Sequence, residues 1–169
     1  MSDDTAFERF VRQHTSAMYR AAYLLTGNKF EAEELLQDTL ARLYPKWDRV
    51  MAADKPLAYV HRSLANRAVS RSRAPAARAE SRWELPERWD GSDLSERVAV
   101  SRTVWELLGT LPHKQRAALV MRYFYDLAED DIAAALDCRP ATVRSLVSRG
   151  VAAMRAGYFA APAAAEGSR

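Results

Sequence analysis

The sequence predicts an all-α protein made of two small helical domains joined by a flexible linker. Apolar residues make up 49% of the 169 residues and recur at helical spacing, whereas strand-like alternation is hard to find. The helical period is interrupted at 74–95, where Ala, Pro and Arg come first and further Pro, Gly and Ser follow. We therefore expect domains at 1–73 and 96–159, a linker between them, and a disordered tail at 160–169.

The first domain is expected to contain three helices with recognisable end signals. Gly27 is suited to end the first helix, and Asn28 with Glu31 forms a capping box for the second. Pro56 opens the third helix, because proline is tolerated in a first turn. The apolar stripes of these helices are Phe7, Val11, His14, Met18, Ala22 and Leu25, then Leu35, Leu36, Leu40, Leu43, Tyr44 and Trp47, and then Leu57, Val60, Leu64 and Val69.

The third helix is expected to carry a basic surface, because residues 56–73 contain four arginines and no acid. Basic groups can follow phosphates, and amide or aromatic side chains can read or stack on exposed bases. A solvated helix face accounts for the same charges, so the pattern leaves both interpretations open. The residues in question are Tyr59, His61, Arg62, Asn66, Arg67, Ser70, Arg71 and Arg73.

The second domain begins with a possible capping box of Asp93 and Glu96 and has a further helix starting at Pro112. Leu119, Val120, Tyr123 and Phe124 are expected to face the core from that helix. The linker before this domain holds Trp83 and Trp89, which either dock on another molecule or pack back on a domain.

Residues 130–149 read as a helix, a tight turn and a second helix with a basic outer face. This is the pattern of a helix-turn-helix whose second helix enters the major groove of DNA. An ordinary helical hairpin with a solvated face is the alternative. The expected buried residues are Ile132, Ala133, Leu136, Val143, Leu146 and Val147, and the outward ones are Thr142, Arg144, Ser145, Ser148 and Arg149, with Arg139 and Arg155 nearby.

The composition narrows the possible classes of protein. Lys and Arg number 25 against 22 Asp and Glu, so the net charge of +3 says little about partners. The single cysteine, Cys138, excludes an internal disulfide and a cysteine-rich zinc site, and it fits a reducing cytoplasm. No apolar run approaches the length of a membrane span, and the polar N-terminus is unlike a signal peptide. We expect a cytoplasmic protein that does not span a membrane.

The order and spacing of the motifs resemble the bacterial extracytoplasmic-function (group IV) sigma factors of RNA polymerase, from Phe7 to about Tyr158. Residues 31–40 are similar to the acidic-apolar pattern of region 2.2, and residues 56–67 to regions 2.3 and 2.4. Residues 111–116 resemble the start of the second helix of region 4.1, and 131–133 with 142–145 resemble region 4.2.

This resemblance implies an alternative sigma factor that binds core RNA polymerase and directs promoter recognition and transcription initiation. The helix at 31–44 would dock on polymerase through Glu34, Leu35, Gln37, Asp38 and Arg42. The third helix would engage the minus-ten element through Tyr59, Arg62, Asn66, Arg67, Ser70, Arg71 and Arg73, with the pocket for an extruded base at Asn66. The minus-thirty-five element would be read by Arg139, Thr142, Arg144, Ser145, Ser148 and Arg149.

Several positions depart from the family pattern. Ala128 and Asp131 replace the usual Ser or Thr cap and the Glu of the first motif helix, and Asp126 is a candidate substitute cap. Asp137 stands where the turn usually carries Gly, and Leu146 replaces a basic residue. These changes leave the predicted fold intact but bear on which promoter sequence is read.

Two other classes of function compete with this interpretation. A stand-alone helix-turn-helix regulator is the alternative, although the separate basic helix and the lack of an obvious dimerisation segment count against it. An enzyme is disfavoured because His14, His61 and His113 form no metal-spacing pair and phosphate-binding glycine loops are absent. We expect no catalysis, cofactor, metal or small-molecule substrate; the linker leaves room for an anti-sigma factor as a further partner.

Overall fold

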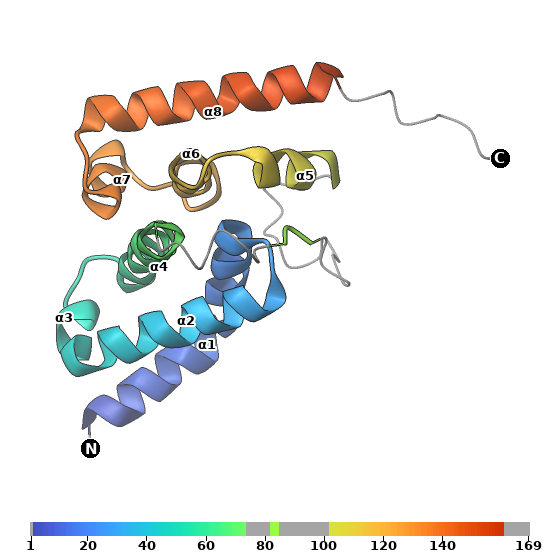
Figure 1. Cartoon of the computed structure of the whole chain (residues 1–169). Helices are drawn as coiled ribbons and strands as arrows, with labels where there is room; N and C mark the ends of the chain where they lie inside the picture. Colours follow the sequence, from blue (N-terminus) through green and yellow to red (C-terminus); the bar gives the residue numbers. More distant parts are fainter. Residues whose placement is uncertain (1, 74–81, 85–101, 161–169) are drawn as a thin grey trace.

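The computed structural model describes residues 2–73, 82–84 and 102–160, and every regular element in these ranges is helical (Figure 1). The first group comprises α1 (Ser2–Thr26), α2 (Lys29–Leu43), the 3₁₀ turn η1 (Tyr44–Lys46), α3 (Trp47–Met51) and α4 (Pro56–Ser72). The second comprises α5 (Arg102–Thr110), α6 (His113–Leu119), the π-helical segment η3 (Val120–Phe124), α7 (Glu129–Leu136) and α8 (Pro140–Ala160). The all-α prediction is confirmed for these residues.

Helix ends in the first group follow the local signals. Gly27 ends α1 with a left-handed φ of 69°, a conformation that glycine adopts at little cost. The side chain of Asn28 then accepts hydrogen bonds from the backbone N–H groups of Phe30 (2.9 Å) and Glu31 (3.3 Å). Pro56 occupies the first turn of α4. The predicted helix ends at Gly27, Asn28 and Pro56 are confirmed; the capping box of Asp93 and Glu96 lies outside the described residues.

The turn between α7 and α8 also matches its prediction, whereas the start of α7 does not. Asp137 adopts the left-handed conformation expected of it, with φ 51° and ψ 54°. Ala128 is the N-cap of α7 and provides no side-chain hydrogen bond. Asp126 is therefore not a substitute cap: it lies two residues earlier, with a positive φ of 53°.

The predicted apolar stripes form most of the core. Fully or nearly fully buried members include Met18, Ala22, Leu25, Leu35, Leu43, Val60, Leu64, Leu119, Val120, Ile132, Leu136 and Val143. Leu146 and Val147 are only partly buried. Tyr123 and Tyr44 were predicted to face the core, but 56% and 44% of their surfaces, respectively, are exposed. Tyr123 lies in π-helical η3 and Tyr44 in 3₁₀ η1, and either change of winding rotates a residue away from its α-helical direction.

The two groups of helices pack directly on each other. Helix α4 contacts α1, α2 and α3 of its own group and also α6, η3 and α7 of the second group. Figure 1 shows α4 lying between α2 on one side and α6 and α7 on the other, with α8 outermost. The predicted basic helix is consequently an interior layer of this structure.

Candidate nucleic-acid interface

The outer face of α8 displays the residues predicted to read the upstream element. All six of Arg139, Thr142, Arg144, Ser145, Ser148 and Arg149 are exposed, while Val143 on the opposite face is buried. The guanidinium of Arg144 pairs with Glu129 of α7. This arrangement leaves a row of hydroxyl and guanidinium groups facing outward, which are donors suited to base edges and phosphates.

A groove beside this row contains residues that the sequence patterns did not single out. Arg122 and Tyr123 of η3 line it together with Val147, Val151 and Arg155 of α8. Helical periodicity placed Tyr123 in the core and gave no reason to select Arg122. The π-helical winding of η3 is what brings both to the surface, and no simple sequence signal marks such a segment.

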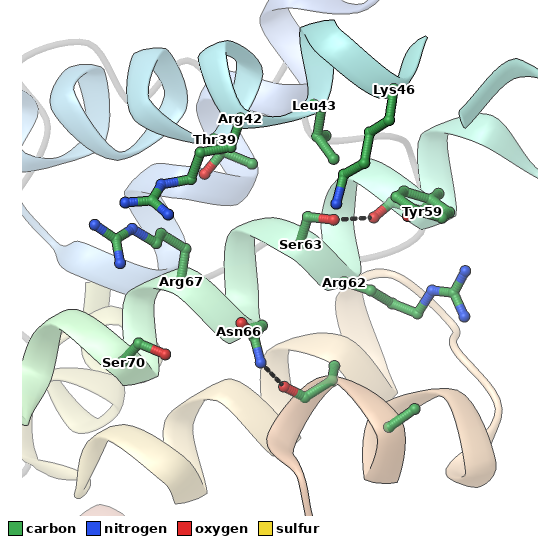
Figure 2. A pocket seen from close by; sticks show the side chains of 12 residues that line it. Thr39, Arg42, Leu43, Lys46, Tyr59, Arg62, Ser63, Asn66, Arg67 and Ser70 are labelled. Atoms are coloured by element: carbon green, nitrogen blue, oxygen red, sulfur yellow. Dashed lines mark hydrogen bonds between the residues drawn. The ribbon is translucent and has the colours of Figure 1, made fainter. Parts of the chain in front are cut away.

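A cavity of about 540 Å³ collects most residues predicted for the downstream element. Figure 2 shows side chains from α2 and η1 on one side and from α4 on the other, with α7 closing the lower edge. The lining comprises Thr39, Arg42, Leu43 and Lys46, then Tyr59, Arg62, Ser63, Asn66, Arg67 and Ser70, and finally Ala134 and Ala135. Of the predicted downstream set, only Arg71 and Arg73 lie outside this lining.

Four cationic side chains therefore surround one cavity, and Lys46 is the member that sequence reasoning missed. Lys46 follows a helix end and does not lie on the basic helix, so only the tertiary arrangement brings it to the cavity. The hydroxyl of Thr39 is buried and has no hydrogen-bond partner among the described residues. A polyanionic ligand with hydrogen-bonding bases is the chemical class that such a cavity suits.

Acidic residues from neighbouring helices neutralise the arginines of α4. Arg67 hydrogen bonds to Asp38, and Arg71 Nη2 lies 2.7 Å from Glu34 Oε2. The hydrogen bond from Arg67 holds the pKa of Asp38 below its ordinary value. Arg42 Nε lies 3.3 Å from the other oxygen of Asp38. The absence of acids within 56–73 is thus compensated from α2, which carries the residues predicted to dock on polymerase.

The predicted polymerase-docking set divides into surface and interior residues. Glu34, Gln37 and Arg42 are exposed and Asp38 is half-buried, so all four are available on one side of α2. The prediction that Leu35 contacts polymerase is not compatible with this structure, because its side chain is fully buried in the core. It could contact a partner only if the helix were displaced. Its role is to hold α2 in place from inside.

Contacts from the second group of helices cover part of α4. Asn66 Nδ2 donates to the carbonyl oxygen of Ala135 at 2.7 Å, and Arg62 Nη1 lies 2.9 Å from Asp131 Oδ1. The ring of His61 stacks on Tyr125 with centroids 4.1 Å apart. His61 was expected on the basic surface, yet it is buried there, and desolvation lowers its pKa to about 4.

The sequence left open whether Trp83 and Trp89 dock on another molecule or pack back on a domain. In the structure, Trp83 packs back onto the helices. Its ring stacks on Trp105 with centroids 4.5 Å apart. Trp89 lies outside the described residues. In the described ranges, no group of three His, Cys, Asp or Glu is placed to hold a metal ion. A search of the same ranges also finds no helix with the length and apolarity needed to cross a membrane.

Comparison with known proteins matches both groups of helices. The family model described as Sigma-70 region 2 matches residues 10–78, and that described as Sigma-70, region 4 matches residues 101–154. The RNA polymerase sigma-E factor of Streptomyces coelicolor is 32% identical over 157 residues, covering 92% of this chain and 87% of the relative. The ECF RNA polymerase sigma factor SigW of Bacillus subtilis is 26% identical over 166 residues, covering 90% and 89% respectively.

Two solved structures share the fold. The sigma factor RpoE of Bartonella quintana, solved in complex with the anti-sigma factor NepR, aligns with a TM-score of 0.69 at 22% identity over 93% of this chain and 99% of its own. CnrH, solved with the cytosolic domain of CnrY, aligns with a TM-score of 0.59 at 20% identity over 94% and 91%.

Two helical units, one with a basic helix beside an acidic one and one with a helix-turn-helix, define a promoter-specificity factor of RNA polymerase. The chain belongs to the sigma-70 family, in its extracytoplasmic-function group. It binds core RNA polymerase and promoter DNA and directs transcription initiation, as the motifs predicted.

Proposed function

We propose that the α2 and α4 walls of this cavity take the minus-ten element and that the outer face of α8 reads the minus-thirty-five element. The observation that carries this assignment is the convergence of Arg42, Lys46, Arg62 and Arg67 with Asn66 on one cavity. Asp38 and Asp131 pair with three of these four cations and leave the cavity with a net positive charge. DNA brings one negative charge per phosphate, so this excess favours a nucleic-acid strand over a neutral ligand. In this proposal, residues 1–73 bind the minus-ten element and residues 96–159 bind the minus-thirty-five element.

The cavity has the chemistry needed to hold a base outside the duplex. Extruding a base costs a few kcal/mol, which contacts to the extruded base must offset. The amide of Asn66 can offer donors and an acceptor to a base edge once its Nδ2 is released from Ala135, and the ring of Tyr59 can stack on a base face. Arg67 and Lys46 are then placed to hold the flanking phosphates.

On α8, Arg144 and Arg149 are the proposed readers of base identity, because a guanidinium can donate two parallel hydrogen bonds to guanine. The shorter side chains of Thr142, Ser145 and Ser148 add hydroxyl donors to the same face. The proposed docking surface for polymerase is Glu34, Gln37, Asp38 and Arg42 on α2. We further propose a cytoplasmic protein without catalytic activity, and we include an anti-sigma protein among its partners because the sigma factor RpoE, which shares this fold, is solved in complex with one.

The assignment is tested by transcription in vitro with purified core polymerase, with and without this chain, on a genomic fragment library. We expect chain-dependent transcript starts that share two spaced upstream elements. An absence of new starts, combined with tight binding of duplex DNA by the chain alone, would instead indicate a stand-alone regulator.

Asn66→Ala separates the two proposed surfaces once a promoter is known. We expect normal protection of the upstream element but weaker permanganate reactivity of thymines at the minus-ten element. Arg144→Ala is the matched control, since it should reduce upstream protection first. Normal melting by the Asn66 variant would contradict the proposed base pocket.

A further inference from the structure

Trp83 lies between the two groups of helices, and residues 82–84 together are hydrogen bonded to both groups. The backbone N–H of Glu84 donates to the carbonyl of Gly27 at 2.8 Å, which ties residues 82–84 to the turn between α1 and α2. The indole N–H of Trp83 donates to the carbonyl of Trp105 in α5 at 2.8 Å, and the indole of Trp105 donates to the carbonyl of Glu84 at 3.2 Å. Three residues of the predicted linker thus join one domain to the other.

Arg116 completes this joint. Its guanidinium lies 4.3 Å from the centre of the Trp83 ring, within the range of a cation–π interaction. The same group donates to the carbonyl of Leu108 at 2.8 Å and to that of Leu25, at the end of α1, at 3.4 Å. Burial lowers the pKa of Arg116 only to about 10, so it is cationic at neutral pH. One side chain therefore contacts both domains and the inserted tryptophan.

Two glycines, one from each domain, make room for the ring. A Cβ atom on Gly27 would lie 1.9 Å from Trp83, and one on Gly109 would lie 2.4 Å from it. Gly27 is also required by its positive φ, whereas Gly109 lies in α5 without such a constraint. A side chain at position 109 would therefore collide with the Trp83 ring in this structure.

The joint keeps the domains in an arrangement that cannot serve a promoter. Helix α4 packs on α7, and α7 packs on α8, so the two reading faces lie within about two helix diameters, roughly 20 Å. Elements near minus ten and minus thirty-five are separated by roughly 80 Å of duplex at about 3.4 Å per base pair. In addition, Asn66 and Arg62 are engaged by α7.

We infer that Trp83 is an intramolecular latch that holds the free sigma factor closed, with part of the α4 face covered, and that it must leave its site before both promoter elements can be bound. The covering of the promoter face rests on the function proposed above, whereas the latch itself rests only on the contacts of Trp83. Core polymerase, which must present both domains to DNA, is the partner that would extract it.

The test measures the distance between domains in the full chain. Spin labels are placed on exposed cysteines at Ala52→Cys in the first domain and Ala153→Cys in the second, in a Cys138→Ser background. Pulsed electron resonance then compares Trp83→Ala and Gly109→Ala with the unsubstituted latch. Gly157→Ala is the matched control, because its Cβ would meet only the flexible end of Leu107. Circular dichroism verifies that each variant is folded.

We expect one short distance in the parent chain and in Gly157→Ala. In both latch variants the population with the short distance should fall by about tenfold. Gly109→Ala is the sharper test, since alanine in a helix ordinarily stabilises and leaves the linker untouched. Short distances retained by both latch variants, or a long distance in the parent chain, would overturn the latch.

A second readout separates the latch from the proposed function. Binding of a fluorescent single-stranded DNA carrying the mapped non-template minus-ten sequence is measured without polymerase. Affinity should rise by about tenfold in both open variants. Longer distances without any gain in affinity would retain the latch but contradict α4 as the minus-ten face.

Discussion

At the scale of single residues, Arg116 is a buried cation whose partners are backbone oxygens. Only 6% of its surface is exposed, and its guanidinium donates to the carbonyls of Leu108, Leu25, Gly109 and Leu111. These oxygens lie at or near the ends of α1 and α5, where helices leave carbonyls without intrahelical partners. Arg116 thereby satisfies two helix ends at once.

Arg116→Met should lower the free energy of unfolding by about 3 kcal/mol, because several buried carbonyls lose their donor. Arg116→Lys should recover little of that loss, since one ammonium group lacks the planar fork needed to reach all of them. Urea denaturation followed by circular dichroism measures both. The exposed Arg122→Met is the control, and a loss below about 1 kcal/mol for Arg116→Met would contradict the proposed role.

His61 is a buried imidazole that is favoured in its neutral form. Desolvation, with a smaller contribution from nearby His14, lowers its pKa from 6.5 to about 4. Tyr125 stacks on it, and burial raises the pKa of the Tyr125 phenol, so this neighbour stays neutral as well. Within the described residues, neither His61 Nε2 nor the Tyr125 hydroxyl has a hydrogen-bond partner.

Acidification should therefore destabilise the folded chain between about pH 6.5 and about pH 4. In that interval unfolded His61 binds a proton whereas folded His61 does not, so the free energy of unfolding falls as pH decreases, by at most about 3 kcal/mol. His61→Phe retains a ring on Tyr125 without a titrating group. We expect urea denaturation of this variant to show a smaller decline over the same interval, and equal declines would contradict the assignment.

At the scale of elements, α8 combines a buried side that fixes its orientation with an exposed side that carries its function. Val143 and Gly150 are buried in α8, whereas Arg144 and Arg149 point away from the core. Because the two sides are separate, substitutions on the outer side should alter DNA contact without unfolding the helix.

Arg144→Ala and Arg149→Ala should each lose promoter activity while retaining binding to core polymerase. The reason is that a guanidinium contact to a base edge is worth about 1–3 kcal/mol of discrimination. Transcription from a mapped promoter and co-purification with core polymerase measure the two properties. Loss of polymerase binding with unchanged promoter preference would be the contrary result.

The turn between α7 and α8 stores a small amount of strain at Asp137. A non-glycine residue in the left-handed conformation costs roughly 1 kcal/mol, although Asp is among the residues that tolerate it best. Asp137→Gly should therefore raise the free energy of unfolding by up to about 1 kcal/mol, as measured by urea denaturation. The chain with Asp137→Ala should be destabilised instead, because alanine has the same strain without a polar side chain.

At the scale of the whole molecule, apolar packing that includes the inserted Trp83, rather than charge pairing, holds the two domains together. The ion pair between Arg62 and Asp131 crosses the joint, but 30% and 47% of these side chains are exposed. Exposed pairs contribute little and are screened by salt. Trp83, in contrast, is stacked on Trp105 and covered by Arg116.

The distance between the spin labels at 52 and 153 should therefore change little between about 0.05 M and about 0.5 M NaCl. Asp131→Asn should likewise leave the short distance dominant, whereas Trp83→Ala should not. A closed form that opens with salt, or on loss of Asp131, would assign closure to the ion pair.

The sequence by itself determined the features that depend on neighbours along the chain. Gly27, Asn28 and Pro56 predicted helix ends because caps and turns are decided by a few consecutive residues. The outward row on α8 was also predictable, since helical periodicity alone separates Val143 from Arg144. Family motifs depend on the same local order, so the class of protein could be predicted from sequence.

Only the tertiary structure decided which distant residues meet. No spacing rule pairs Arg67 with Asp38, buries His61 against Tyr125 or brings Lys46 to the α4 cavity. Periodicity also failed where the winding changed, as at Tyr123 in η3. The physical reason is that burial, pairing and the insertion of Trp83 between Gly27 and Gly109 depend on how separate helices pack, and local propensity carries no information about that packing.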